Sequence, residues 1–227
     1  MADPTPQDPA TEGVREAAAE TIRQGVDIRA RVRELTLLAL QRQRFDRHGT
    51  REVIRAVTEG IAAGVERGNA DMRSATAEAL RGLDQALRTS AEAGHAALSQ
   101  LAAAGRGFSD AEFKTALANL RKLEDDFLDT VGMVADAAGA KVQPELRRAL
   151  DAARRSGTET GRQVAAAMGD FAQKFSAASL DAALAGLETA GRVGQQFALV
   201  ASGILAGLAD ALRAPEPPKK GPPAGTA

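Results

Sequence analysis

Two histidines and one acidic cluster are the side chains in this sequence whose types could support catalysis or bind a metal. Neither His48 nor His95 has a second histidine one helical turn away, and the chain contains no cysteine. The acidic side chains gather in a single stretch, at Glu124, Asp125, Asp126 and Asp129. Calcium loops also need a turn and carbonyl ligands, so a solvated helix face is the favoured interpretation. The sequence therefore predicts no metal and no cofactor.

The sequence also lacks the glycine motifs that hydrolases and nucleotide-binding proteins use. There is no GxSxG nucleophile elbow and no GxxxxGK[ST] phosphate loop. One glycine-rich stretch, GRGFSD at Gly105–Asp110, follows a helical pattern rather than a strand, so it is interpreted as a helix end. We expect no catalytic residues, no small-molecule substrate, and a protein that is not an enzyme.

Arginines dominate the region from Arg23 to Arg55, where nine of them stand against four acidic residues. Leucines and valines are interleaved with them, which is typical of a basic amphipathic helix. Such a helix suits a membrane or granule surface, an acidic partner, or nucleic-acid phosphate, with nucleic acid the least favoured. Alternatively, the arginines pair with acidic faces of later helices in one bundle. The candidates for an anionic contact are Arg29, Arg31, Arg33, Arg42, Arg44 and Arg47.

The composition indicates which elements must position these side chains. Hydrophobic residues make up 44% of the 227 residues, but only 3% are aromatic, and there is no Trp or Tyr. The hydrophobic share is mostly alanine, which forms helices readily but buries little area. The formal net charge of −1 gives no global field that would select nucleic acid or an anionic membrane. We expect an all-α protein with a thin core.

Turn and cap signals divide the chain into about four long amphipathic helices, arranged as an elongated bundle between disordered termini. Thr50 is the predicted N-cap after the FDRHGT break, SDAE at Ser109–Glu112 is a capping box, and Pro144 indicates a break. The predicted segments are a disordered tail at 1–12, a basic amphipathic helix at 13–48, a long second helix at 49–106, a third helix at 107–142, a helical region at 143–213, and a disordered proline-rich tail at 214–227.

Apolar side chains recur every eleven residues along these segments. In the second helix one such series is Ile54, Val65, Thr76, Leu87 and Leu98. Eleven residues over three turns is close to the α-helical repeat, so a preserved apolar stripe predicts either slight right-handed supercoiling or breaks, such as the one at Pro144, that reset its phase. Over two or three repeats any amphipathic helix shows this spacing. The stripe residues predicted to bind a surface or partner are Phe127, Phe171, Phe175, Val193, Phe197, Val200, Ile204 and Leu208.

Three glycines, Gly60, Gly64 and Gly68, lie four residues apart in the second helix. Each costs roughly 1 kcal/mol relative to alanine inside a helix. Small residues at this spacing let another helix backbone approach closely. The alternative is compositional drift in an alanine-rich chain from a GC-rich genome.

The most apolar run, FALVASGILAGLA at Phe197–Ala209, is shorter than the ~20 residues that a membrane-spanning helix needs. The beginning of the chain, MADPTPQDPATEG, is polar and acidic, unlike a signal peptide. We expect a cytoplasmic protein, or one that is peripheral on a granule or membrane surface.

The alanine-rich, aromatic-poor helices over residues 14–213 resemble phasins, the bacterial proteins that coat polyhydroxyalkanoate granules. The segment DIRARVRELTLLALQRQRFDRHGTREVIRAVTEGI, Asp27–Ile61, also resembles an uncharacterised bacterial protein family. Some phasins have a lysine-rich tail that contacts DNA; here the tail has only Lys219 and Lys220. Neither resemblance implies catalytic residues.

The leading hypothesis is a non-catalytic structural protein with an exchangeable apolar stripe. The stripe would pack inside the free bundle, or against an apolar granule or membrane surface or a partner helix. The alternative is a cytoplasmic helical scaffold that assembles into a homo-oligomer and has no lipid or polymer role. A nucleic-acid-associated protein is the third possibility.

Overall fold

The computed structural model describes residues 9–42, 46–68, 71–104, 111–174 and 195–213, and all regular structure in these ranges is α-helical. The prediction of an all-α protein is therefore confirmed. In chain order the helices are α1 (Pro9–Gln24), α2 (Ile28–Arg42), α3 (Arg47–Arg67), α4 (Met72–Ala103), α5 (Ala111–Arg121), α6 (Leu123–Ala137), α7 (Gln143–Ser156), α8 (Glu159–Lys174) and α10 (Gln195–Arg213).

The estimate of about four long helices is wrong, because each predicted helix is divided. The first is split between α1 and α2, where Gly25 (φ 68°) and Asp27 (φ 48°) adopt left-handed backbone conformations. Glycine has no Cβ and aspartate is short and polar, so both tolerate this region. Helix α1 already begins at Pro9, so residues 9–12 are helical rather than part of a disordered tail. Residues 1–8 and 214–227 lie outside the described residues.

The second predicted helix is divided into α3 and α4. Helix α3 ends before Gly68, and α4 begins after Asp71, whose carboxylate accepts a hydrogen bond from the Arg73 N–H at 3.1 Å. At the start of α3 the N-cap is Asp46, which accepts from the Gly49 N–H at 2.8 Å. The prediction of Thr50 as N-cap is wrong, because an aspartate four residues earlier already caps the helix.

Shorter breaks divide the rest of the chain. Lys122 separates α5 from α6, and Pro144 lies in the first turn of α7, where a break is predicted. Gly157, with φ 73°, ends α7, and α8 begins two residues later. Ser109 of the predicted capping box lies outside the described residues.

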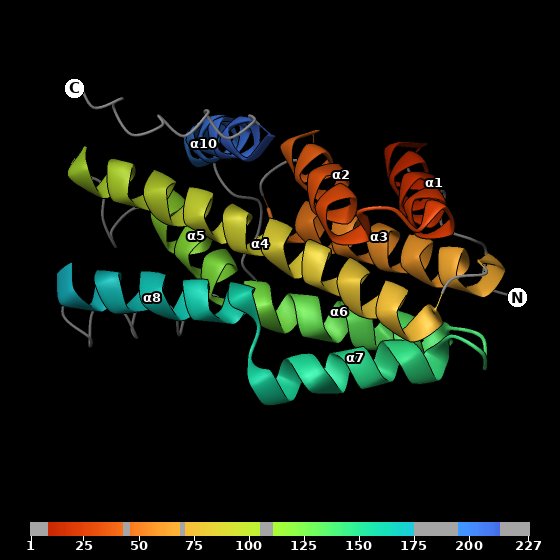
Figure 1. Cartoon of the computed structure of the whole chain (residues 1–227). Helices are drawn as coiled ribbons and strands as arrows, with labels where there is room; N and C mark the ends of the chain where they lie inside the picture. Colours follow the sequence, from red (N-terminus) through yellow and green to blue (C-terminus); the bar gives the residue numbers. More distant parts are fainter. Residues whose placement is uncertain (1–8, 43–45, 69–70, 105–110, 175–194, 214–227) are drawn as a thin grey trace, which may run out of the picture.

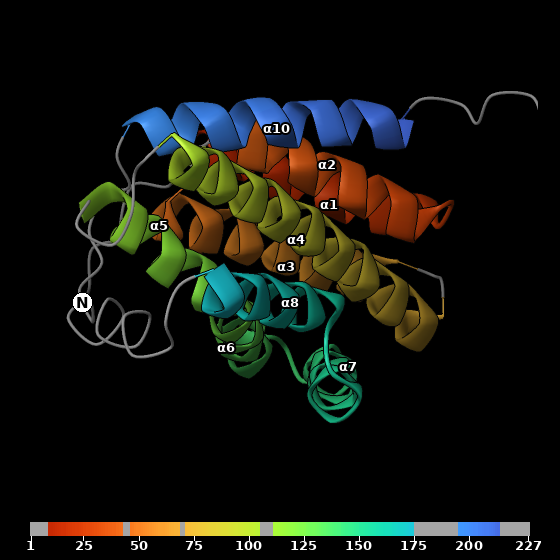
Figure 2. The same cartoon turned by 90° about the vertical axis from the view of Figure 1, so that its left-hand side faces the viewer.

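Helices α3 and α4 form the centre of the bundle (Figure 1). Helix α1 packs on α3, and α2 packs mainly on α4. Helices α6 and α8 cover the opposite side, and α7 packs against α6 at the periphery (Figures 1 and 2). Helix α10 lies across α4 and α2, on the side away from α7 (Figure 2).

Two of the three glycines that the sequence singles out make the close helix contact between α3 and α1. A Cβ at Gly64 would lie 2.7 Å from the Ala19 carbonyl oxygen, and one at Gly60 would lie 2.7 Å from the Ala18 Cβ. Real Cβ atoms do not approach other atoms this closely, so these positions need glycine. Gly68 has a different role, since it is the C-cap of α3.

The same device joins α2 to α4 at Gly82, a position that the sequence analysis did not select. A Cβ there would overlap the Arg29 carbonyl oxygen and lie 3.1 Å from the Val32 Cβ. Glycines on α3 and α4 therefore allow the two N-terminal helices, α1 and α2, to pack closely on the central pair.

Candidate functional site

Helix α10 differs from the other helices in having almost no charge. Between Phe197 and Leu212 its only charged residue is Asp210. A helix on the surface of a soluble bundle normally carries a polar face toward water. Helix α10 therefore has unusually few charged residues for a helix at the surface, and it is the candidate functional site.

The inner face of α10 is seated on the bundle. Phe197, Ala201, Leu205 and Ala209 are buried, and the helix packs mainly on α4, with further contacts to α2 and α5. The Glu112 carboxylate accepts a hydrogen bond from the Phe197 N–H in the first turn. A carboxylate at this end of a helix also interacts favourably with the helix dipole. Two of the four buried side chains are alanines, and Val200, Ile204 and Leu208 are partly buried against the core beside them.

The outer face of α10 is also apolar. Leu199 is 73% exposed on this face, whereas Leu212, 47% exposed, lies at the end of the helix on the side that faces α2. In the part of the chain that the structure describes, nothing lies within 4 Å of a Cβ built at Gly203 or Gly207. The outer face is therefore a strip of one leucine and small residues that faces open space, with the exposed Asp210 near its end.

Helix α2 lies beside the end of α10, on the side of Ala209 and Leu212. A small cavity of about 70 Å³ between α2 and α10 is lined by Ala30, Arg33, Glu34, Leu37, Ala209 and Leu212. The fold thus places one of the predicted arginines, Arg33, beside the exposed end of the last helix. The sequence alone did not predict this neighbourhood, because the two helices are far apart in the chain.

Other predicted arginines pair within the bundle. Arg29 on α2 donates to the Glu78 carboxylate on α4 at 2.9 Å, and Arg31 donates to the Gln24 side chain. Hydrogen bonding from Arg29 lowers the pKa of the Glu78 carboxyl. Arg42 is exposed at the end of α2, and Arg44 lies outside the described residues.

The strongest internal pair joins α3 to α6. Two nitrogens of Arg47 contact the two carboxylate oxygens of Asp126 at 2.6 and 2.7 Å, and the nearest nitrogen of Arg51 lies 3.7 Å away. The hydrogen bond to Asp126 raises the pKa of the Arg47 guanidinium. For Arg29 and Arg47 the structure therefore favours the internal-pairing interpretation over a free anionic contact.

The predicted stripe residues do not form one continuous surface. Phe127 lies on α6 and Phe171 on α8, and both are buried inside the bundle. Phe197, Val200, Ile204 and Leu208 share α10, where the last three are partly buried against the core. Helices α6, α8 and α10 pack on different parts of the bundle, so these residues do not line one continuous stripe. Phe175 and Val193 lie outside the described residues.

The titratable candidates serve structural contacts. His95 contacts the Asp170 carboxylate at 2.9 Å and packs edge-on against the Phe171 ring, with ring centroids 5.1 Å apart. His48 is exposed in the first turn of α3. Within the described residues, no group of three or more His, Cys, Asp or Glu side chains could hold a metal ion.

The acidic cluster is not a uniformly solvated face. Asp126 is buried against Arg47, and the Glu124 carboxylate accepts a hydrogen bond from the Thr158 hydroxyl ahead of α8. Asp125 and Asp129 are exposed. The cluster is divided because α6 presents alternate sides to α3 and to solvent.

A second carboxylate caps α8, and the sequence analysis missed it. Asp84 on α4 accepts hydrogen bonds from the Glu159 N–H at 2.8 Å and the Thr160 N–H at 3.0 Å. These amide groups begin a helix and have no partner within it. Asp84 lies 75 positions before Glu159, so no local spacing in the sequence could indicate this contact.

Comparison with known families identifies one match. A family model described as "Family of unknown function (DUF6781)" matches residues 4–214. The chain belongs to this family. The predicted resemblance to an uncharacterised family is thereby confirmed, while the resemblance to phasins stays a prediction. No curated protein and no solved structure matches the chain.

The sequence predicts that the most apolar run is too short to span a membrane, and the observed helices can be compared with that prediction. Within the described ranges, no helix combines the length and apolar content that crossing a membrane requires.

Proposed function

We propose that this DUF6781 protein is a non-catalytic structural protein that associates with an apolar surface, such as a granule or membrane interface, through α10. In the free protein the inner face of α10 packs on α4. At an apolar surface α10 detaches from α4, and that surface covers both the inner and the outer face of the helix. The observation that carries the proposal is the apolar outer face of α10, with Leu199 73% exposed.

The composition of α10 supports surface association. A helix that is apolar on all sides is normally buried, and this one is covered on its inner face only. Each large side chain transferred from water to an apolar phase contributes roughly 1.5–3 kcal/mol. Leu199 supplies a driving force approaching that order, and the half-buried Leu212 supplies less.

The apolar side chains that α10 buries against the bundle support its transfer to another apolar surface. Phe197 and Leu205 are the two large, fully buried side chains on the inner face, and alanines occupy the positions between and after them. Detaching α10 exposes these side chains together with the partly buried Val200, Ile204 and Leu208, and the new surface would cover all of them again.

Neighbouring arginines support a preference for anionic interfaces. Arg33 borders α10 at Leu212, and Arg42 is exposed at the end of the same helix α2. Basic residues near an anionic surface contribute about 1 kcal/mol each. The finer parts of the proposal, an eleven-residue stripe shared by several helices and a phasin-like role on polyester granules, rest on sequence pattern and resemblance.

Co-sedimentation tests the proposal. We expect the protein to sediment with anionic liposomes or polyester beads, and Leu199→Asp to reduce the bound fraction at least tenfold. Val26→Asp is the matched control, since Val26 is 60% exposed in the connection between α1 and α2. Loss of binding in both variants, or in neither, would count against α10 as the contact.

Self-assembly is the second candidate function, and the open glycines of α10 favour it. Gly203 and Gly207 repeat the spacing of Gly60 and Gly64, which receive a helix inside this chain. A second copy could occupy the outer face in the same way. Light scattering distinguishes this candidate: a compact monomer at all concentrations would remove it, and an oligomer disrupted by Gly203→Leu would support it.

A further inference from the structure

The connection between α1 and α2 is three residues long, from 25 to 27, and its backbone is strained. Gly25 (φ 68°) and Asp27 (φ 48°) both adopt left-handed conformations. Aspartate enters this region more easily than most residues, but at a cost in free energy that glycine does not have. Val26, between them, is an exposed hydrophobic side chain. Local backbone and side-chain preferences therefore oppose the reversal of the chain at this point.

The sequence across this connection continues the spacing of a single helix. Ala18 and Ile22 are buried on α1, and Val32 is buried on α2. Steps of three or four residues lead from Ile22 through Gly25 and Arg29 to Val32, and no proline interrupts them. Residues three and four apart share one face of a helix. One straight helix through residues 25–27 would therefore keep the buried residues of α1 and α2 on the same side.

Helix α1 forms its main contact with α3 rather than with α2. Gly60 and Gly64 on α3 provide the close approach, and Ile22 is buried beside Gly64. The ion pairs of Arg15 and Arg23 are with glutamates of α1 itself. The contact between α1 and α3 is thus a helix-to-helix contact that α1 of a second copy could make equally well.

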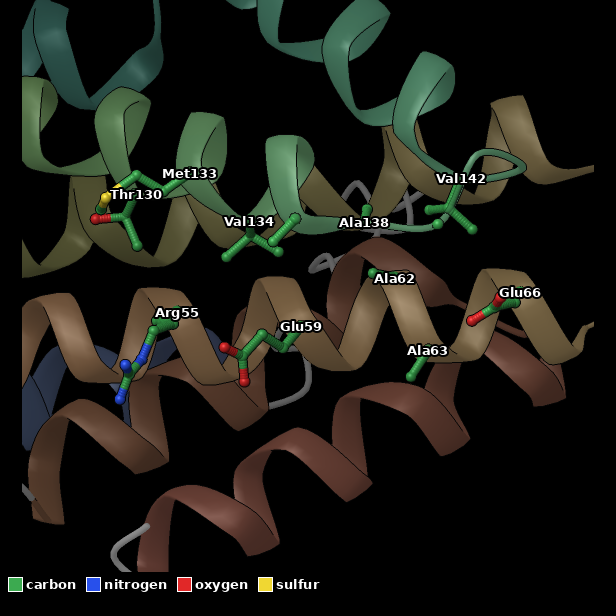
Figure 3. A pocket seen from close by; sticks show the side chains of 12 residues that line it. Arg55, Glu59, Ala62, Ala63, Glu66, Thr130, Met133, Val134, Ala138 and Val142 are labelled. Atoms are coloured by element: carbon green, nitrogen blue, oxygen red, sulfur yellow. The ribbon is translucent and has the colours of Figure 1, made fainter. Parts of the chain in front are cut away.

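The side of α3 that faces α6 is separate from the side that receives α1. Ala62 on α3 lines a cavity of about 430 Å³ there, together with Val134 and Ala138 from the opposite wall (Figure 3). Among the described residues, none of this lining comes from α1. An exchange of α1 would therefore leave the packing of α3 on α6 unchanged.

From these features we infer that residues 25–27 are a hinge and that the protein forms a domain-swapped dimer. The hinge straightens, α1 and α2 become one helix, and α1 packs on α3 of a second copy. The contact of α1 with α3 is then made between two chains instead of within one, and a short strained connection favours such an exchange.

Opening the hinge removes both left-handed conformations. It gives up the contact between α1 and α2, including the hydrogen bond from Arg31 to Gln24. Helix α10 takes no part in the exchange, so the dimer is independent of the surface association proposed above.

Size-exclusion chromatography with light scattering tests the inference on the full-length protein, incubated at increasing concentration in mild urea and then diluted. We expect a dimer that separates from the monomer. Gly25→Ala should raise the dimerisation constant roughly tenfold, because alanine disfavours a left-handed conformation. Asp27→Gly, which relieves the strain in the closed hinge, should lower it. Gly13→Ala is the matched control: it adds a methyl group to the exposed face of α1, away from the hinge, and should leave the constant unchanged.

Cross-linking distinguishes the swap from a dimer made by other contacts. The chain has no cysteine, so Arg15→Cys on α1 and Glu59→Cys on α3 each introduce a single thiol. These positions are close, because a Cβ at Gly60 would overlap the Arg15 carbonyl oxygen. The two variants are mixed, allowed to dimerise and treated with a bifunctional maleimide. We expect a cross-link between one chain of each variant, which Gly203→Leu on α10 does not prevent.

Three results would overturn the inference. The first is a monomer at all concentrations in both the wild type and Gly25→Ala. The second is an equal effect of Gly25→Ala and Gly13→Ala on the dimerisation constant. The third is a dimer that gives no cross-link between the two cysteine variants or that is abolished by Gly203→Leu. None of these results affects the co-sedimentation test of α10.

Discussion

Asp126 illustrates how individual residues hold this thin core together. Its carboxylate is 5% exposed and bridges to Arg47 on another helix through two hydrogen bonds. Local sequence reasoning grouped Asp126 with its acidic neighbours, because the partner lies 79 positions away. Long-range pairs of this kind leave no periodic signal, whereas the close contacts at Gly60 and Gly64 do, because glycine is otherwise disfavoured in helices.

Asp126→Asn tests this pair. Removing one partner of a largely buried ion pair leaves the other charge uncompensated, and we expect a loss of about 2–4 kcal/mol in the free energy of unfolding. Asp125→Asn, at the exposed neighbouring position, should change it by less than about 0.5 kcal/mol. Urea denaturation measures both. Equal effects would contradict a specific role for Asp126.

The Arg29–Glu78 pair predicts a pH dependence. Hydrogen bonding from Arg29, and also from Arg81 on the same helix as Glu78, lowers the folded-state pKa of Glu78. The contribution of these contacts is therefore present above the ordinary carboxyl pKa and is lost as pH falls through the lowered value. The stability difference between the wild type and Glu78→Gln should therefore be constant above about pH 5.5 and shrink at more acidic pH. Denaturant titrations at several pH values measure it, and the double variant with Arg29→Gln should add nothing further.

At the scale of elements, the helical class was predictable and the helix ends were less so. Composition and apolar spacing indicate helices throughout, and Pro144 lies where a break is predicted. The break between α1 and α2 was missed, since one glycine with an aspartate two residues later resembles a tolerated helix interior. Positive φ at Gly25 and Asp27 reverses the chain there, so that α1 and α2 pack side by side with α3 and α4.

Gly64→Ala tests the close packing of α1 on α3. In an open helix this substitution stabilises by roughly 0.5–1 kcal/mol. At Gly64 the added Cβ would lie 2.7 Å from both the Ala19 carbonyl oxygen and the Ile22 Cβ, so we expect destabilisation by about 1–3 kcal/mol. Gly169→Ala on α8, where the described residues leave open space, is the control and should stabilise. Thermal unfolding of the two variants should move in opposite directions.

For the whole molecule, the sequence predicted an apolar stripe but not its division among helices. Phe127 and Phe171 belong to the interior, and among the stripe residues that the structure describes, those on α10 are the ones beside an exposed apolar face. A pattern along the chain cannot show which turns reverse direction, so the candidate site could be narrowed to α10 only from the fold. The cavity of about 430 Å³ between α3 and α6 could not be predicted from the sequence either, because it depends on the distance between those two helices.

The central claim is that the inner face of α10 detaches from the bundle and binds an apolar surface instead. The chain has no tryptophan, so Phe197→Trp places a single fluorescent probe on the inner face of α10. We predict that anionic vesicles containing brominated acyl chains quench this probe, because the inner face enters the lipid. A second variant, Leu199→Trp, reports the outer face. Quenching of the Leu199→Trp probe alone, with the Phe197→Trp probe unchanged at saturating lipid, would contradict exchange.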